Sequence, residues 1–430
     1  MKDLNRLRRQ VQAAWAKVPL ETKAKLELKM AVGHFHALAA RKHALSAAPR
    51  PPRELAMLQS LLHGDPDQLL SSTSAAVPQG LFTTVDTDGA VYFGNVDYDA
   101  TDPGWAYCLP AMIETMNATP PFKVGNVIQI PDNTSMAILG DWGGWNGPAQ
   151  SIAAAAKSSA YLVHIGDVYY AGTNSDGGRL DPYEPTHFVN VWPGVAGRSF
   201  ALNSNHDMYA HATGYALTTL AAPAFQAQGG NCFALCNQAF RFVGLDSAYY
   251  APDNRLEDFP GYMKGYLGDP QGPQMAFLKD QIAKLTAGQT LVLLTHHNGL
   301  NLDGSIPKTS DDPYQLWQQV TQVLQQIPAA ASKKVLWYYG HEHAGAVYKP
   351  QQAGAVTVYP RCNGHGCIPW GLATILAKST HLLWFEKKIV GPGSNYFVTN
   401  GYATLALNGA SLTEAFFDQN GKQSWSGTFP

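Results

Sequence analysis

From Ser135 onward, the chain repeats a pattern in which a short apolar run stops abruptly at a residue able to bind a metal ion. Five such runs occur, and their sequences are SMAILGD, AYLVHIGD, RSFALNSNHD, TLVLLTHH and KVLWYYGHEH. Each run has the length of a buried β-strand. Apolar residues at helical spacing lie between several of the runs, for example Leu278, Ile282 and Leu285. Strands that alternate with helices predict an α/β protein built on a sheet.

The pattern before Ser135 differs and indicates two further units. Apolar positions at helical spacing begin at Leu4, and a helix-forming sequence continues after the proline-rich stretch APRPPR. We therefore expect residues 1–75 to form a helical N-terminal unit. The stretch LFTTVDTDGAVYF then holds two β-rich runs around a tight-turn sequence, so residues 76–132 are expected to be a small β-rich connector. The α/β domain that carries the five runs is expected to span residues 133–430.

Composition places the chain among globular proteins of ordinary size. It has 430 residues, of which 45% are hydrophobic and 14% are charged. No window approaches the ~18 uninterrupted apolar residues of a transmembrane helix. No export signal is visible either, so a cytoplasmic location is expected. The five cysteines are too few for a disulfide framework and form no CxxC zinc half-site, although two close pairs could still bridge; they are Cys108, Cys232, Cys236, Cys362 and Cys367.

Charge is distributed unevenly along the chain. Residues 1–60 hold twelve lysines and arginines against four acidic residues, which gives this arm a charge of +8 and leaves −10 on the remainder. A basic arm of this kind could meet an anionic partner such as nucleic acid or an anionic surface. The alternative is an ordinary helical unit with a solvated basic face, because no aromatic residues for base stacking alternate with the basic ones.

The polar ends of the five runs predict a metal site. In order along the chain they read GD, GD followed by two tyrosines, NHD, HH and GHEH. In open α/β sheets the ligand crevice lies beyond the carboxyl ends of the strands, so five such ends could converge on one crevice. Together they offer carboxylate, amide and imidazole donors, a mixture that can hold metal ions.

In this combination of motifs the chain resembles the calcineurin-like metallophosphoesterases and, within them, the purple acid phosphatase branch. The motifs are GDWG (140–143), GDVYY (166–170), NHD (205–207), VLLTH (292–296) and GHEH (340–343). The resemblance covers about residues 133–420. It implies two central β-sheets packed face to face with flanking helices. It also implies a binuclear-metal-dependent hydrolase of phosphomonoesters or phosphodiesters, with a metal-bound hydroxide as the nucleophile.

The resemblance also implies which residues hold the metals. It assigns the first metal to Asp141, Asp167, Tyr170 and His343, and the second to Asp167, Asn205, His296 and His341, with Asp167 as the bridge. Carboxylate and phenolate suit Fe(III) at the Tyr170 site, while imidazole and amide suit a divalent iron, zinc or manganese ion.

One departure from the family pattern concerns the first metal. Most members have histidine as the third residue of an Asp-x-His motif, whereas Gly143 stands at that position here. We expect Tyr170 to supply the missing ligand through its phenolate oxygen. The alternative is that Tyr169 and Tyr170 are aromatic core residues at a strand end.

Four further residues are candidates for catalysis. His206 could orient the ester or protonate the leaving group, or it could only support a neighbouring ligand. His297 competes with His296 for the role of metal ligand. Arg361 and His365 follow the GHEH strand, and Arg361 could grip a phosphate group as a bidentate donor; ordinary turn residues are the alternative for both.

Two rival functions remain open from sequence alone. The first is a nucleic-acid-directed phosphodiesterase that uses the basic N-terminal arm to hold its substrate. The second is a non-catalytic binding protein on a phosphatase scaffold. Every proposed ligand position is occupied, which argues against the second rival, because drift in a non-catalytic protein usually removes ligands first.

Overall fold

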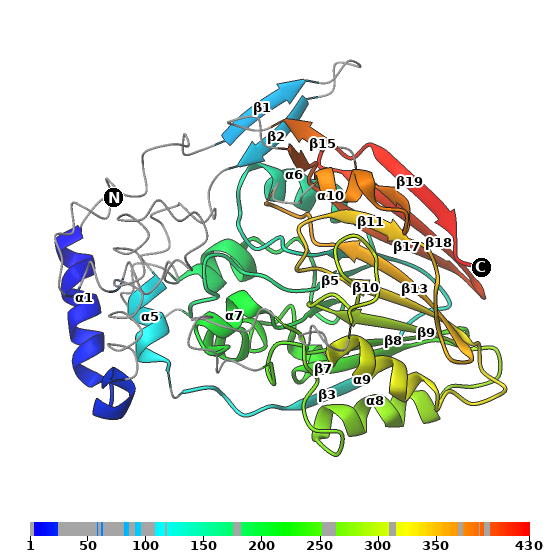
Figure 1. Ribbon diagram of the computed structural model, residues 1–430, viewed down its shortest axis with the longest axis horizontal. Helices are drawn as coiled ribbons and strands as arrows, with labels where there is room; N and C mark the ends of the chain where they lie inside the picture. Colours follow the sequence, from blue (N-terminus) through cyan, green and yellow to red (C-terminus); the bar gives the residue numbers. More distant parts are fainter. Residues whose placement is uncertain are drawn as a thin grey trace.

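The computed structural model describes most of the chain. The described residues are 4–24, 58, 62, 81–85, 91–95, 108–116, 118–174, 182–251, 264–308, 315–368, 373–386, 388–390 and 396–430. In this part of the chain, two large β-sheets form the centre of the molecule (Figure 1).

The larger sheet has nine strands in the order β14-β11-β13-β10-β9-β8-β7-β3, and β12 pairs with β13 outside this path. Its strands β8, β9, β10 and β13 run parallel to one another, so their carboxyl ends meet at one edge. Both faces of these strands are covered, which explains why their sequences read as continuous apolar runs. The bounds are β3 Val124–Gln129, β7 Cys232–Cys236, β8 Phe240–Leu245, β9 Thr290–Thr295, β10 Lys334–Tyr339, β11 Gly345–Tyr348, β12 Gln351–Ala353, β13 Val356–Asn363 and β14 Leu382–Phe385.

The smaller sheet has six strands in the order β19-β18-β17-β4-β5-β6. Its strands β4, β5 and β6 are parallel, whereas the C-terminal strands β17, β18 and β19 are antiparallel. The bounds are β4 Asn133–Leu139, β5 Tyr161–His164, β6 Ser199–Ala201, β17 Gly401–Asn408, β18 Ser411–Asp418 and β19 Gln423–Thr428.

The two sheets pack face to face through one apolar core. Ile138 and Phe200 of the smaller sheet belong to the same cluster of buried side chains as Phe242, Val292 and Leu336 of the larger sheet. The predicted α/β class with two packed central sheets and flanking helices is therefore confirmed.

Helices cover the outer faces of this pair of sheets. Helices α8 (Pro273–Ala283) and α9 (Gln315–Leu324) lie against the larger sheet in Figure 1, and their apolar side chains share a core cluster with its strands. Helix α6 (Gly147–Ala156) packs toward the smaller sheet, since Ile152 and Leu139 belong to one cluster. The other short helical segments are α7 Asn205–Tyr209, α10 Ala373–Lys378, π-helical turns at Glu184–Phe188 and Tyr215–Thr219, and 3₁₀ turns at Val189–Val191 and Gln226–Gln228.

The N-terminal part is described only in pieces. Helix α1 (Leu4–Lys17) packs against α5 (Leu109–Glu114), and the Nζ atom of Lys17 lies 3.8 Å from a carboxylate oxygen of Glu114. Strands β1 (Leu81–Val85) and β2 (Val91–Asn95) pair antiparallel. The turn between them, and most of the unit expected over residues 1–75, lie outside the described residues.

The division of the chain into three units stays a prediction, and the structure corrects one detail of it. Strand β3 falls in the connector expected over residues 76–132, yet it pairs with β7 as an edge strand of the nine-stranded sheet. The α/β region therefore begins no later than Val124. Sequence alone could not show this, because the partner of β3 lies more than 100 residues further along the chain.

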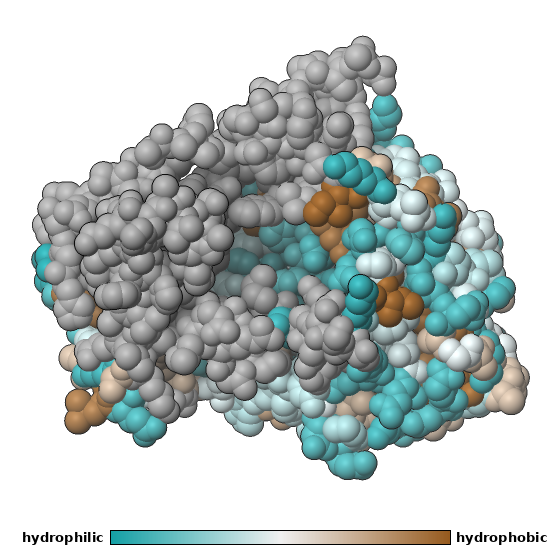
Figure 2. All heavy atoms as spheres, in the orientation of Figure 1, coloured by the Kyte–Doolittle hydropathy of each residue, from teal (hydrophilic) through white to brown (hydrophobic). Residues whose placement is uncertain are grey.

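Two other expectations concern the membrane and the cysteines. Among the described residues, no helix combines the length and the apolar character needed to span a membrane. Cys232 and Cys236, like Cys362 and Cys367, are buried and form no disulfide. Figure 2 shows that hydrophilic residues dominate the described surface on one face of the molecule, with apolar residues in separate small groups.

Arg361 lies between the two sheets, which corrects the expectation that it grips phosphate. From β13 its Nε and Nη2 atoms each donate to Glu414 of β18 at 2.8 Å, and the hydroxyl of Tyr338 donates to the same carboxylate at 2.6 Å. Arg361 is paired in register with Tyr338 on β10, so both side chains point toward the other sheet. Both faces of this sheet are covered, and the sequence could not indicate which face Arg361 would occupy.

Breaking this ion pair should destabilise the fold. Arg361 and Glu414 are 4% and 1% exposed, so removing either partner leaves an uncompensated buried charge. We expect Arg361→Met or Glu414→Gln to lower the free energy of unfolding by about 3–5 kcal/mol, measured by chemical denaturation. The double variant Arg361→Met/Glu414→Leu should recover most of that loss. If the double variant loses as much free energy of unfolding as the single variants, then packing, and not the unpaired charge, accounts for the loss.

Candidate metal centre

The ends of five strands converge at one edge of the paired sheets. Asp141 follows β4, Asp167 follows β5, Asn205 follows β6, His296 follows β9 and His341 follows β10. Backbone hydrogen bonds tie neighbouring ends together, from Asp141 N–H to the carbonyl of Gly166 (2.9 Å) and from Gly340 N–H to that of His296 (2.9 Å).

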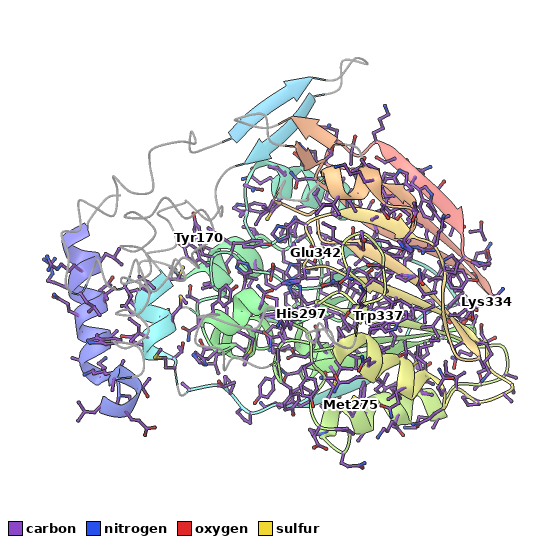
Figure 3. All side chains as sticks on the ribbon, in the orientation of Figure 1. Tyr170, Met275, His297, Lys334, Trp337 and Glu342 are labelled. Atoms are coloured by element: carbon purple, nitrogen blue, oxygen red, sulfur yellow. The ribbon has the colours of Figure 1, made fainter. Side chains whose placement is uncertain are left out.

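Figure 3 shows where this edge lies along β10. Lys334 lies at the start of the strand, Trp337 lies in its middle, and Glu342 lies beyond its end, on the side where His297 is also found. The residues of the GHEH motif therefore follow the strand at the edge where the other motifs end.

Three of the residues at this edge have an unusual backbone conformation. Asp141, Asp167 and His341 have φ angles of 55°, 74° and 65°. Residues other than glycine are uncommon in this left-handed region, and they concentrate at functional sites where the surrounding structure holds them in place. The sharp backbone bend at each of these residues therefore helps to direct its side chain toward the site.

Two glycines of the motifs are required by close contacts. Gly166 has a φ of 110°, and a Cβ atom there would lie 2.4 Å from Nδ1 of His296. At Gly143, a Cβ atom would lie 2.6 Å from the carbonyl oxygen of Asp167. Gly143, which stands where the pattern that the sequence resembles has a histidine, therefore has no room for a side chain unless the backbone shifts.

The first group of donors at this edge consists of four side chains, which are Asp141, Asp167, Tyr169 and His343. The phenol of Tyr169 donates to Oδ2 of Asp167 at 2.8 Å, and it lies 3.4 Å from Oδ1 of Asp141 and 3.0 Å from Nε2 of His343. Nε2 of His343 is 3.3 Å from Oδ1 of Asp141. All four side chains thus meet around one point.

Tyr169, and not Tyr170, is the tyrosine that the structure brings to this group, which corrects the sequence-based assignment. The ring of Tyr170 packs on Tyr183 with centroids 5.2 Å apart, and Figure 3 shows Tyr170 apart from His297 and Glu342. The physical reason is backbone pairing with the first motif. Val168 bridges to Gly143, whose N–H donates to the carbonyl of Asp167 at 3.1 Å and whose carbonyl accepts the N–H of Tyr169 at 3.0 Å, so the backbone on both sides of Val168 is fixed beside Asp141.

A second group of donors contains His296, Asn205, His341 and the other oxygen of Asp167. Nε2 of His296 lies 2.7 Å from Oδ1 of Asn205 and 3.2 Å from Oδ1 of Asp167. Nδ1 of His341 lies 3.1 Å from the same amide oxygen.

The protonation pattern makes Nε2 of His296 an acceptor that faces two oxygen acceptors of the second group. Nδ1 of His296 lies 3.0 Å from the carbonyl of Ile165, so in the neutral ring it carries the proton and donates it there. Burial lowers the pKa of His296, which favours the neutral ring. Nδ2 of Asn205 donates to Tyr209, which turns its Oδ1 toward the histidines. A nitrogen lone pair and two oxygen atoms then converge with no proton between them, which is an arrangement that a cation satisfies.

The first group has a matching electrostatic pattern. Burial, and then the charge of Asp167, raise the pKa of Asp141 well above its ordinary value. Burial also acts to raise the pKa of Asp167, but the charges that His206 and His296 carry in their protonated forms outweigh it and hold that pKa well below the ordinary range. Burial opposes protonation of His343, yet its contacts with both carboxylates raise its pKa to about 9. Positive charge is therefore favoured between the two carboxylates.

His206 lies beside both groups and contacts the backbone of the tyrosine pair. Its Nδ1 donates to the carbonyl of Tyr170 at 2.6 Å, and its Nε2 lies 3.8 Å from Oδ2 of Asp167. Its ring is mostly buried against Tyr169, with centroids 4.4 Å apart. Burial first of all lowers its pKa to about 4, although the charge of Asp167 acts in the opposite direction.

His365 does not reach this edge, which corrects the expectation that it lines the crevice. The side chain is fully buried, and a Cβ atom added to Gly345 or Gly401 would lie within 3 Å of its Nε2. Burial lowers its pKa to about 3. Its ring centroid is 6.2 Å from that of Phe416, so His365 belongs to the interior between the sheets.

Two serines that sequence reasoning did not assign support the site. Ser204 begins helix α7 with an extended backbone, and its hydroxyl accepts the N–H of Asp207 at 3.2 Å, as a helix N-cap does. Ser247 follows β8, and its Oγ lies 2.9 Å from Nδ1 of His297. The N-cap pattern of serine before a short helix was a usable signal for Ser204, whereas nothing in the sequence links Ser247 to a residue 50 positions away.

Comparisons with known proteins give fold-level likeness only. No family model matches the sequence, and no curated protein matches it. Among solved structures, the GAP50 anchor in the inner membrane complex of Plasmodium is 15% identical, with a TM-score of 0.44 over 69% of this chain and 88% of that chain. A structure of PhoD is 13% identical, with a TM-score of 0.44 over 70% of this chain and 73% of that chain.

A third neighbour is an uncharacterised protein, a predicted phosphoesterase, from Streptococcus pneumoniae. It is 10% identical, with a TM-score of 0.28 over 69% of this chain and 97% of that chain. These neighbours are calcineurin-like metallophosphoesterases, the family whose motifs the sequence resembles. At TM-scores below 0.5 the likeness carries no argument about chemistry, for which the side chains of the site are the basis.

Proposed function

We propose that this chain is a metallophosphoesterase that hydrolyses phosphate esters with two bound cations. One observation carries the proposal. Nε2 of His296, Oδ1 of Asn205 and Oδ1 of Asp167 converge as acceptors in a buried space, and Oδ1 of Asp167 has no hydrogen-bond partner among the described residues. Buried acceptors that face one another without a proton are costly unless a cation lies between them.

The donor sets divide between two ions that share Asp167. Carboxylate and phenolate oxygens suit Fe(III), while imidazole and amide donors suit a divalent iron, zinc or manganese ion. When bound, such a pair supplies positive charge for the phosphoryl oxygens and acidifies a water molecule near neutral pH. The proposed ligands are Asp141, Asp167, Tyr169 and His343 for the first ion, and Asp167, Asn205, His296 and His341 for the second.

The protein's own residues prepare this site in three ways. The carbonyl of Ile165 fixes the proton of His296 on Nδ1, so Nε2 is the donor atom. Asp141 accepts the backbone N–H of His341 at 2.9 Å through its Oδ2, which couples the first group to the second. The ring of His206, packed on Tyr169 and held by the carbonyl of Tyr170, forms the wall beside Asp167.

His206 should shape the space beside Asp167 through its packing, and not donate a proton at neutral pH. With a pKa of about 4 the ring is neutral at pH 7, and its single N–H donates to the carbonyl of Tyr170. We expect His206→Ala to keep both metals and to lower kcat by on the order of 10²-fold, equally for 4-nitrophenyl phosphate and for phenyl phosphate, the ester with the poorer leaving group. A loss confined to phenyl phosphate would assign His206 to proton transfer instead.

The experiment that tests the proposed function is metal-dependent ester hydrolysis by the full-length chain. We expect 4-nitrophenyl phosphate or bis(4-nitrophenyl) phosphate to be hydrolysed, the activity to be lost on chelation, and re-addition of Fe and Zn to restore it. Activity that survives complete removal of metals would refute the proposal. The rival function, a nucleic-acid-directed phosphodiesterase, depends on the basic N-terminal arm. Most of that arm lies outside the described residues.

A further inference from the structure

His297 lies beside the second group of donors but takes no part in the ligand set given above. Its side chain is buried, and its ring centroid lies 4.7 Å from that of His341 and 5.0 Å from that of His296. One nitrogen atom from each of these three histidines lies within 4.8 Å of the other two. Because zinc–nitrogen bonds are ~2.0–2.1 Å long, two nitrogen atoms on one ion lie at most about 4.2 Å apart, so separations of up to 4.8 Å are only slightly wider than the spacing of ligands on one ion.

Ser247 holds the imidazole of His297 from the neighbouring strand end. Its Oγ accepts the backbone N–H of His297 at 3.0 Å and lies 2.9 Å from Nδ1 of the same residue. One hydroxyl thus fixes both the backbone and the ring. Histidines that bind metal ions commonly use one ring nitrogen for the ion and the other for an orienting partner of this kind.

We propose that His297 binds the second metal ion through Nε2 and that Ser247 is the residue that positions its ring. This inference rests on the proposed function, because it requires an ion at the second group. With His296, His341 and His297, that ion would have three imidazole ligands in addition to the oxygens of Asn205 and Asp167. A nitrogen-rich set of this kind favours zinc over manganese or magnesium, which prefer oxygen ligands.

The test measures metal affinity and not turnover. Zn²⁺ and Mn²⁺ are titrated into metal-free full-length protein in competition with a chromophoric chelator, for the wild type and for His297→Ala, Ser247→Ala and His381→Ala. Loss of a partner that only orients a ligand costs 10–100-fold in metal affinity. We therefore expect Ser247→Ala to weaken one zinc site by about tenfold and His297→Ala to weaken it by about a hundredfold or more, with a smaller effect on Mn²⁺. The control His381→Ala should be unchanged, since His381 lies next to β14 and outside both donor groups.

A spectroscopic measurement counts the ligands directly. In protein loaded with Fe(III) at the first site and Zn²⁺ at the second, X-ray absorption at the zinc edge should report three imidazoles in the wild type and two in His297→Ala. If His297→Ala fails to fold, two other results decide whether the proposal holds. They are the expected tenfold loss of zinc affinity in Ser247→Ala and the number of imidazole ligands in the wild type.

The possible failures are distinguishable. Two bound ions with unchanged zinc affinity in both variants would overturn the role of His297 and leave the proposed function intact. A raised KM with unchanged metal affinity would make His297 a substrate contact, and the proposal would again be wrong. A wild-type chain that binds Mn²⁺ but no Zn²⁺ would overturn this inference alone, whereas one that binds neither of these ions nor iron would refute the proposed function as well.

Discussion

Replacing Asp167 by asparagine should remove both metal ions and nearly all activity. Asp167 places one oxygen in each group of donors, at 2.8 Å from the hydroxyl of Tyr169 and at 3.2 Å from Nε2 of His296. On the proposed function, a neutral amide would withdraw the one negative charge that both ions share. Two such ions together would stabilise the transition state by several kcal/mol, so kcat/KM should fall by at least about 10³-fold.

The measurement for Asp167→Asn is metal content together with phosphatase activity. Asp280→Asn is a matched control, because Asp280 lies on helix α8, forms a surface ion pair with Lys284 and is remote from the site. The control should bind metal and turn over like the wild type, and circular dichroism should show both variants folded. Near-normal metal content in Asp167→Asn would remove this residue from the bridging role.

Replacing Tyr169 by phenylalanine should abolish a colour that replacing Tyr170 leaves intact. In the metal-free chain, burial and the charges of Asp167 and Asp141 raise the pKa of Tyr169 well above its ordinary value, so its phenol is protonated. An Fe(III) ion at the first group would displace that proton, and a ferric phenolate absorbs visible light by charge transfer. We expect iron-loaded wild type and Tyr170→Phe to be coloured and Tyr169→Phe to be colourless.

The pair of variants makes this result informative. Loss of the band in Tyr170→Phe, with the band kept in Tyr169→Phe, would reinstate the assignment drawn from sequence spacing. Active iron-loaded wild type without any band would show that neither tyrosine binds Fe(III). The site would then hold two divalent ions.

The sequence singled out the motif residues at the strand ends, and these side chains lie close together in the structure. Asp141, Asp167, Asn205, His296, His341 and His343 carry chemistry in their side chains and follow recognisable apolar runs, and the structure brings them together. The α/β class followed from the same runs. Their assignment to two particular ions stays a proposal.

The errors had a common physical cause, which is the direction of a side chain. Tyr169 and Tyr170 are adjacent, and the choice between them depends on a strand-like bridge between Val168 and Gly143 that no local pattern reveals. Arg361 was placed at the right strand, but its direction depends on Glu414 of the other sheet. His365 lies two residues beyond that strand, yet it enters the interior because glycines leave room for its ring. Contacts with distant parts of the chain therefore decide whether the side chain of a residue near the site points into it.

The most direct test of the account is the number of metal ions per chain. The full-length protein is expressed in medium replete with iron, zinc and manganese, purified without chelators and subjected to elemental analysis alongside Asp167→Asn. The account predicts about two ions per chain in the wild type and fewer than about one in the variant. Fewer than about one ion per wild-type chain, with no hydrolysis of either aryl ester, would contradict it and favour a non-catalytic protein on a phosphatase scaffold.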